Sequence, residues 1–314
     1  MSKKTIEKIL KSKHSALDKC LDEVDAKLRT YESLILLRDK IATETLTDEL
    51  YKFLNFHGEL ESILVDLPMK SQVPTSSLED LRTSQLAYVD TAIEGAFTDI
   101  KEAIKKLFHH FLEWLKDWFY TNRRLRFYLI QNITRLKNYR MHYGDPASFE
   151  IAKGSCYMYS EWDTMMTASE KINDLMSKVP ETGGQAKYFV DHFREFSSAF
   201  EEFGYEMTDC SIVKRDPKYL RRLMFLGQTG AKWVRDDLIN DCERAMANLK
   251  SEEQFSAGIS KIQRSMSAAI NKAHDPNDLN AMKWFVYMCK LSYSISGSCA
   301  RGVLDVCSIA RRES

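Results

Sequence analysis

The chain has 314 residues, of which 44% are hydrophobic and 11% aromatic, a composition that excludes a wholly disordered protein. It carries 45 Lys plus Arg and 45 Asp plus Glu, so its zero net charge predicts no overall attraction to nucleic acid. With only 12 Gly and 6 Pro, it is expected to form long helices with short connections. We therefore predict an all-α fold, an elongated multi-helix bundle of long amphipathic helices.

The charges are segregated along the chain. Residues 1–40 carry +3, 41–100 carry −8, 101–140 carry +7, 141–210 carry −8 and 211–314 carry +6. Two interpretations fit this alternation. Acidic and basic helices pair within one chain, which is the simpler case, or neighbouring copies assemble head to tail.

Cysteine usage and hydropathy indicate the compartment. The seven cysteines are widely spread and no two lie at CxxC spacing, so neither a zinc site nor a disulfide framework is predicted. The start, MSKKTIEKIL, lacks the apolar core of a secretory signal. No run reaches the roughly 18 apolar residues that a transmembrane helix needs. We expect a protein made in a reducing cytoplasm, without signal peptide or transmembrane helix.

Residues 1–67 are predicted to form an N-terminal helical hairpin. Apolar residues at helical spacing place the first helix at 5–40 and the second at Thr47–Leu67. Residues 68–77 are predicted to be a linker, because they hold two of the six prolines.

Residues 78–144 are predicted to form the central element, either one long helix or a helical hairpin. Ser77 resembles an N-cap for it, with Asp80 at the third helical position. Apolar side chains then recur at steps of three and four, which is typical of one stripe of an amphipathic helix. A break near Asn122 is favoured, although no Gly or Pro forces one there. The candidate packing residues of this element are Phe111, Trp114 and Trp118.

The central element is also strongly basic. The candidate residues for contact with DNA or an anionic surface are Lys101, Lys105, Lys106, Lys116, Arg123, Arg124, Arg126, Arg135, Lys137 and Arg140. Three interpretations remain open. The element is a bundle's core helix with solvated cations, a membrane-surface helix whose aromatics enter the headgroup boundary, or a DNA contact with steep salt dependence.

Residues 145–314 are predicted to form a C-terminal helical bundle. Its expected helices span 158–179, a short segment from Asp216 to Leu226, 231–250, 252–274, and a last helix from Asp275-Pro276 to about Ile309. The middle of the last helix is rich in Ser, Gly and Ala, which permits close approach of another helix in the core or between subunits. The clearest stripe is a candidate buried seam or assembly surface formed by Phe189, Phe193, Phe196, Phe200 and Phe203.

No spacing in the chain indicates catalysis. The run GQTGAKW at 227–233 lacks the spacing and the hydroxyl of a phosphate-binding loop, so we interpret it as a turn between helices. Asp236, Asp237 and Asp241 have metal-compatible spacing, but acidic helix faces of this kind are usually solvated. The histidines form no HExxH pattern. We expect no enzyme, no metal and no cofactor.

One family resemblance concerns residues 1–140. The run FTDIKEAIKKLFHHFLEWLKDWF, from Phe97 to Phe119, precedes a basic helical tail, and LDEVDAKLRTYESL, from Leu21 to Leu34, has a polar coiled-coil style. This arrangement resembles the internal or minor virion proteins of large tailed bacteriophages, in which a polar coiled-coil part commonly precedes such a helix. The resemblance implies a structural protein that is carried in or on the phage head and accompanies the genome.

The expected function is therefore that of a non-enzymatic structural protein of a phage virion, inside the head or associated with it, which assembles through helix–helix contacts. Its expected partners are further copies of itself or other capsid proteins, with weak, non-specific contact to double-stranded DNA. The alternative is a membrane-active or membrane-scaffolding helical protein that acts through the amphipathic helix 93–119. A membrane is the less favoured partner.

Overall fold

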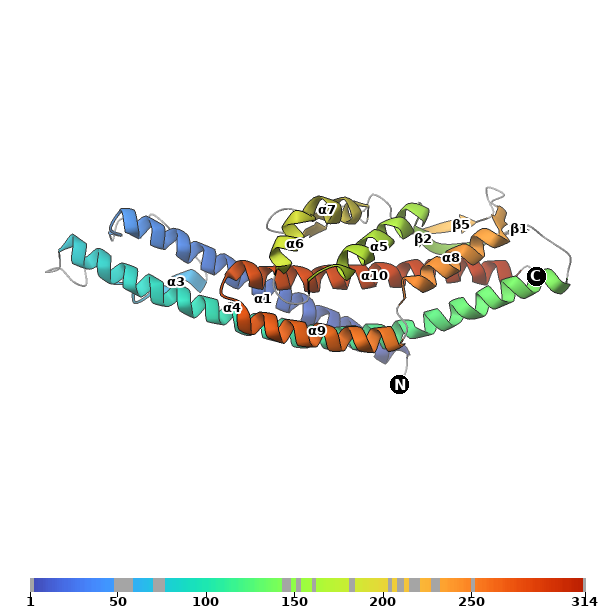
Figure 1. Ribbon diagram of the computed structural model, residues 1–314, viewed down its shortest axis with the longest axis horizontal. Coiled ribbons are helices and arrows are strands. Elements are labelled where there is room, and N and C mark those ends of the chain that lie inside the picture. Colours follow the sequence, from blue (N-terminus) through green and yellow to red (C-terminus); the bar gives the residue numbers. More distant parts are fainter. Residues whose placement is uncertain are drawn as a thin grey trace. The chain divides into compact units, whose positions relative to one another are not determined.

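Helices dominate the protein, as the sequence predicted (Figure 1). The computed structural model describes residues 3–47, 59–69, 77–142, 148–150, 154–159, 162–180, 184–202, 205–207, 212–214, 221–226, 232–249 and 252–312. The all-α class is thus confirmed for the main architecture. Six short strands within the described residues were not predicted. No helix in these ranges has both the length and the apolar character needed to cross a bilayer.

The chain divides into two compact units. Unit 1 comprises Met1–Phe111 and Ala269–Lys283, and unit 2 comprises Leu112–Ala268 and Trp284–Ser314. The predicted boundaries at 67, 77 and 144 do not coincide with these units. Helices α4 (Leu78–His142), α9 (Glu252–Lys272) and α10 (Pro276–Arg312) supply residues to both.

Unit 1 is organised by the pairing of α1 (Lys3–Thr43) with the first half of α4 (Figure 1). The two helices run antiparallel, because Lys106 pairs with Glu23 at 2.7 Å while Arg38 pairs with Asp90 at 2.5 Å. The core at one end consists of Leu34, Leu37, Ile41, Leu46, Leu60, Leu64, Leu67, Met69 and Val89. The predicted second helix is wrong at its C-terminal end, since α3 (Glu59–Ile63) stops before Leu67.

The predicted cap of α4 is confirmed. The Ser77 hydroxyl accepts a hydrogen bond from the Asp80 backbone N–H at 3.0 Å and donates one to the Asp80 carboxylate at 2.6 Å. Such a cap satisfies a backbone donor that the first helical turn leaves without a partner. Most of the predicted linker 68–77 lies outside the described residues.

A buried glutamine joins three segments of unit 1. The Gln85 side chain is fully buried on α4. It accepts a hydrogen bond from the Leu46 N–H at 3.1 Å and donates to the carbonyls of Leu46 at 2.8 Å and Pro68 at 2.9 Å. These bonds satisfy backbone groups that burial removes from water. Gln85 therefore fixes the segments that follow α1 and α3 against α4.

Helix α4 is continuous from Leu78 to His142, so the favoured break near Asn122 is wrong. Asn122 is only 3% exposed, and its amide donates to the Trp118 carbonyl at 2.7 Å. Its side-chain oxygen accepts a hydrogen bond from Arg301 of α10 at 2.9 Å. Tertiary contacts thus hold a modest helix former within the helix.

Unit 2 contains three antiparallel strand pairs within the region 145–314, for which a helical bundle was predicted. Strand β1 (Ser148–Glu150) pairs with β6 (Lys232–Val234), β2 (Gly154–Tyr159) with β5 (Arg221–Leu226), and β3 (Tyr205–Met207) with β4 (Ile212–Lys214). The predicted short helix ending at Leu226 is therefore wrong. The helix predicted from Met158 is also wrong at its start, since α5 (Trp162–Ser177) follows β2.

The phenylalanine stripe is divided between two helices rather than carried by one. Helix α6 (Gln185–Asp191) ends at His192, which caps it and precedes α7 (Phe193–Glu201). Phe189, Phe196 and Phe200 are buried, whereas Phe193 is half-buried. The Phe189 and Phe196 ring centroids lie 5.6 Å apart, so the predicted seam packs across the bend. Phe203 lies outside the described residues.

The small residues of α10 allow α4 to approach closely within unit 2. A Cβ added at Gly297 would lie 3.1 Å from the Asn122 side-chain oxygen and 3.6 Å from the Trp118 ring. Ser296 is likewise buried and bonds to Ser169 of α5 at 3.3 Å. The sequence left open whether these small residues pack in the core or between subunits, and within this chain they pack in the core. Unit 2 also contains α8 (Arg235–Ala247).

Replacing Gln85 with Leu should destabilise the protein by about 1–3 kcal/mol, because buried backbone groups of Leu46 and Pro68 lose their partners. Denaturant unfolding followed by circular dichroism measures this. Gln263→Leu, the same change at an exposed helical position, is the control and should change the free energy of unfolding by less than about 0.5 kcal/mol. Equal stability of the two variants would contradict the role of Gln85.

Two glycine-to-alanine variants should respond in opposite directions. Gly258→Ala should stabilise by about 0.5–1 kcal/mol, because nothing lies within 4 Å of its added Cβ on α9. Gly297→Ala should destabilise, because two hydrogen bonds hold Asn122 in place against the new methyl group. Thermal unfolding of both variants decides the matter. A stabilised Gly297→Ala variant would show that the two helices separate easily.

Candidate functional site

Three of the ten predicted cations lie in unit 1 and are engaged there. The Lys101 ammonium lies 4.7 Å from the Phe97 ring centroid. Lys105 pairs with Glu102 at 2.5 Å and Lys106 with Glu23 at 2.7 Å. The hydrogen bond with Glu23 raises the pKa of the Lys106 ammonium.

Three further cations make contacts within unit 2. Arg126 donates to the carbonyls of Met246 at 2.8 Å and Leu249 at 2.6 Å, at the C-terminal end of α8. A cation at this position compensates the negative end of the helix dipole. Arg135 donates to the Cys307 carbonyl at 3.1 Å, and Lys137 pairs with Glu243 at 2.8 Å. Six of the ten candidate cations thus contact other residues of the same unit.

The remaining described cations, Lys116, Arg123 and Arg124, are exposed. Arg140 belongs to α4, but its side chain lies outside the described residues. The structure therefore does not gather the nine described cations on one open surface. It separates them into residues beside the buried stripe and residues opposite to it.

The candidate aromatic residues of α4 are buried. Phe111 is 0%, Trp114 2% and Trp118 8% exposed, and the Trp118 ring packs against Tyr293 with centroids 4.7 Å apart. They belong to the apolar stripe that faces the core. Because they are buried, these side chains can contribute to assembly only by stabilising the folded unit.

A second, exposed set of large side chains lies on the opposite side of α4. We call this surface the outer α4 face, and it consists of Lys116, Tyr120, Arg123, Arg124, Phe127, Tyr128 and Ile130. Tyr120 is 62%, Phe127 57%, Tyr128 47% and Ile130 45% exposed. Positions 116, 120, 123, 127 and 130 follow at steps of four, three, four and three, which places them on one helix face.

The outer α4 face has only positive charge along most of its length. Residues 118–140 contain no Asp or Glu. The Arg123 guanidinium lies 5.6 Å from the Tyr120 ring centroid, a cation–π distance. A groove of about 610 Å³ continues this surface towards α10 and is lined by Tyr128, Ile130, Gln131, Asn132, Thr134, Arg135 and Leu304. The face is thus apolar, aromatic and basic.

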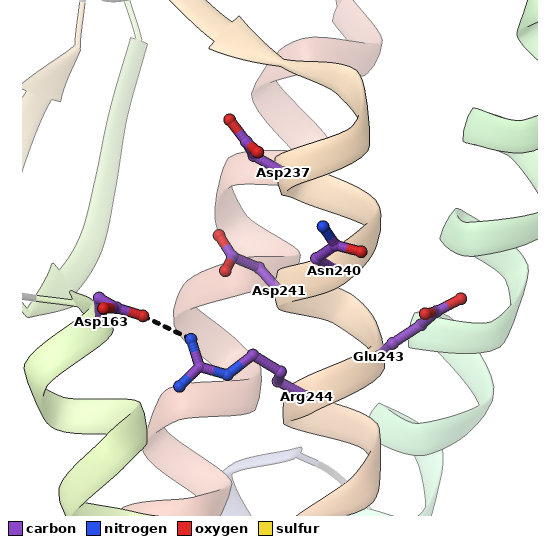
Figure 2. A pocket seen from close by; sticks show the side chains of 6 residues that line it. All are labelled: Asp163, Asp237, Asn240, Asp241, Glu243 and Arg244. Carbon is purple, nitrogen blue, oxygen red and sulfur yellow. Dashed lines mark hydrogen bonds and ion pairs between the residues drawn. The ribbon is translucent and has the colours of Figure 1, made fainter.

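A second pocket of about 570 Å³ lies between α5 and α8 in unit 2. Figure 2 shows Asp237, Asp241 and Arg244 of α8 on the side that faces Asp163 of α5. Asn240 and Glu243 complete its lining. No group of three or more His, Cys, Asp or Glu among the described side chains is arranged to hold a metal ion.

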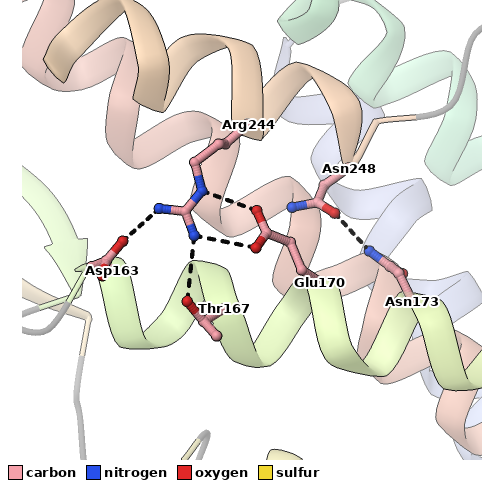
Figure 3. Close-up of polar contacts among 6 residues, drawn as sticks. All are labelled: Asp163, Thr167, Glu170, Asn173, Arg244 and Asn248. Atoms are coloured by element: carbon pink, nitrogen blue, oxygen red, sulfur yellow. Dashed lines mark hydrogen bonds and ion pairs between the residues drawn. The ribbon is translucent and has the colours of Figure 1, made fainter.

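Arg244 connects α8 to α5 (Figure 3). Its guanidinium donates to both carboxylate oxygens of Glu170, at 3.0 and 3.2 Å, and also to Asp163 and Thr167. The hydrogen bond with Glu170 raises the pKa of Arg244. Asn173 extends the contact by donating to Asn248 at 3.0 Å. This network holds α8 against α5, and its role is therefore structural.

Two cysteines that no spacing rule connected meet in unit 2. The Cys242 and Cys307 sulfurs lie 3.5 Å apart, and both side chains are fully buried. Their mutual hydrogen bond and burial raise the pKa of the Cys242 thiol. Since 64 residues separate them in the sequence, no local signal indicated this contact.

Neither family models, curated proteins nor solved structures give a match to this chain.

Two carboxylates that contact Arg244 should differ in importance. Glu170→Gln should destabilise unit 2 by about 1–2 kcal/mol, because it weakens a two-point, part-buried contact. Asp163→Asn should cost less than about 0.5 kcal/mol, since the Asp163 side chain is 85% exposed. Chemical denaturation of both variants provides the comparison. A larger effect of Asp163→Asn would contradict the assigned geometry.

Proposed function

We propose that this chain is a non-enzymatic structural protein of a bacteriophage particle, in or on the head, and that it docks onto protein through the outer α4 face. The observation that carries the docking role is the exposure of this face. The assignment to a phage particle rests on the resemblance of residues 1–140 to head-associated virion proteins. Helix–helix contacts are the means of assembly.

The concentration of exposed apolar side chains supports docking. Eight large hydrophobic side chains are exposed in the described residues, and four of them lie within the eleven residues from Tyr120 to Ile130. Contiguous exposed apolar surface marks interaction sites. Tyr and Arg are also enriched among the residues that dominate binding energy at protein interfaces. The composition of the outer α4 face therefore favours a protein partner.

Charge defines the partner further. Lys116, Arg123 and Arg124 surround the exposed rings, and no carboxylate accompanies them between residues 118 and 140. A complementary surface has an apolar centre with Asp and Glu around it. Arginine guanidinium groups bind such carboxylates with two parallel hydrogen bonds.

DNA is the weaker candidate partner. Ten free cations would give a log–log salt slope of about −9, at about −0.9 for each phosphate neutralised. The three cations of the outer α4 face, which make no described ion pair, give only about −3 by the same rule. We therefore expect weak, sequence-independent DNA contact that accompanies protein docking rather than replaces it.

The membrane alternative uses the stripe of residues 93–119. Most of its large side chains are buried, including Leu107, Phe111 and Trp114 at 2% exposed or less. Insertion into a headgroup layer would require these side chains to leave the core. The outer α4 face offers Phe127 and Ile130 to lipid, so vesicle binding is a direct competitor in the test.

The chain should be present in density-purified particles of its source phage. A tagged copy carrying Arg123→Gln, Arg124→Gln and Phe127→Ala should be retained at least about tenfold less than the unchanged copy, because hot-spot side chains are lost. Quantitative mass spectrometry of the particles measures retention. Val190→Ala, a change at a 75% exposed side chain of unit 2, is the control and should be retained normally.

Three results would overturn the proposal. The chain is missing from the particles, or the triple variant is retained like the control. Alternatively, the purified chain floats with anionic phospholipid vesicles, and Trp114→Ala with Trp118→Ala abolishes this without unfolding, which would support the membrane alternative. Tight duplex DNA binding that persists in high salt would equally show that DNA is the principal partner.

A further inference from the structure

Unit 1 has exposed apolar side chains among acidic ones, the opposite charge pattern to the outer α4 face. We call this surface the acidic end of unit 1, and it consists of Glu61, Val65, Asp66, Leu78 and Glu79. Val65 is 69% and Leu78 59% exposed. The three carboxylate side chains are exposed as well. The segment 41–100, to which all five belong, carries a net charge of −8.

Hydrogen bonds bring the two parts of this surface to one end of unit 1. The Thr45 hydroxyl, just beyond α1, donates to the Leu78 carbonyl at 3.3 Å. Gln85 joins Leu46 to Pro68, which lies three residues beyond Val65. The end of α3 and the start of α4 therefore both lie beside the segment that follows α1.

We propose that the outer α4 face of one copy docks onto the acidic end of unit 1 of a second copy of this chain. This inference rests on the proposed function and names the partner of the docking face.

Charge and hydrophobicity both favour a second copy as the occupant. The outer α4 face presents three exposed cations, and the acidic end presents three exposed carboxylates. Each surface also has exposed apolar side chains, Tyr120, Phe127, Tyr128 and Ile130 on one and Val65 and Leu78 on the other. The partner chemistry derived from the outer α4 face, apolar with surrounding carboxylates, is thus present on this chain itself.

The two surfaces differ, so the contact between copies is heterologous. Each copy carries one outer α4 face and one acidic end. A row of docked copies therefore always has one unoccupied outer α4 face and one unoccupied acidic end, unless it closes into a ring. Such a contact produces rings or open chains rather than a closed two-fold dimer. Because exposed charges contribute, association weakens as salt screens them.

A pair of charge-reversal variants tests this arrangement by sedimentation velocity over a range of protein and salt concentrations. The first variant carries Arg123→Glu and Arg124→Glu, and the second carries Glu61→Lys, Asp66→Lys and Glu79→Lys. All five side chains are exposed, so both variants should fold, which circular dichroism checks. Lys171→Glu with Lys187→Glu, a reversal at exposed positions elsewhere in unit 2, is the control.

The wild type and the control should form species larger than a dimer, and each reversal variant alone should associate at least about tenfold more weakly. A mixture of the two variants should restore one contact. The first variant retains its acidic end and the second retains its outer α4 face. The two remaining surfaces, negative on the first variant and positive on the second, also carry opposite charges, so the mixture should associate into species that contain both variants.

Several outcomes would overturn the inference. These are a wild type that stays monomeric at high concentration in low salt, a mixture that does not associate, and reversal variants that still assemble. A dimer lost only with the first variant would indicate a two-fold contact instead. Retention in phage particles by a chain that is monomeric in solution would leave the proposed function intact. Assembly by a chain absent from particles would refute the proposed function alone.

Discussion

Burial of one stripe along α4 is the interaction on which both units depend. The stripe begins in unit 1 with side chains such as Ile100 and Ile104 and continues in unit 2 through Trp118, Leu129 and Leu136, all at most 8% exposed. Burying a large apolar side chain contributes about 1.5–3 kcal/mol. A break in α4 would turn part of this stripe away from its core, which explains why Asn122 is held in helical conformation by Trp118 and Arg301.

The same stripe determines which cations of α4 are available. Side chains at its borders reach neighbouring elements, as Lys106 reaches Glu23 on α1 and Arg126 reaches the end of α8. Side chains opposite to it, such as Arg123 and Arg124, reach no described carboxylate and remain exposed. The net charge of a segment therefore overstates its affinity for an anion, because some of its cations already contact other groups of the same chain. What remains at the surface is small in number and mixed with aromatic rings.

The sequence predicted those parts of the structure that local periodicity controls. The three-and-four spacing of α4 identified its buried side, and Ser77 with Asp80 identified its start. The same spacing also defines the outer α4 face, but a stripe of exposed rings such as Tyr120 and Phe127 has the period of a buried one. The strands β2 and β5 escaped notice because RRLMFL has no alternation. Contacts between distant residues, such as those of Arg244, leave no local signal.

The interleaving of the two units imposes an order on synthesis of the chain. Unit 1 needs Ala269–Lys283 in addition to its first 111 residues, and the ion pair of Lys283 with Asp25 joins residues 258 positions apart. At roughly 5–20 residues per second, a ribosome takes roughly ten to thirty seconds to travel from Phe111 to Ala269. During that interval α1 and the first half of α4 have been made without their last partner. Unit 1 is thus begun first and completed late, after most of unit 2 has left the ribosome.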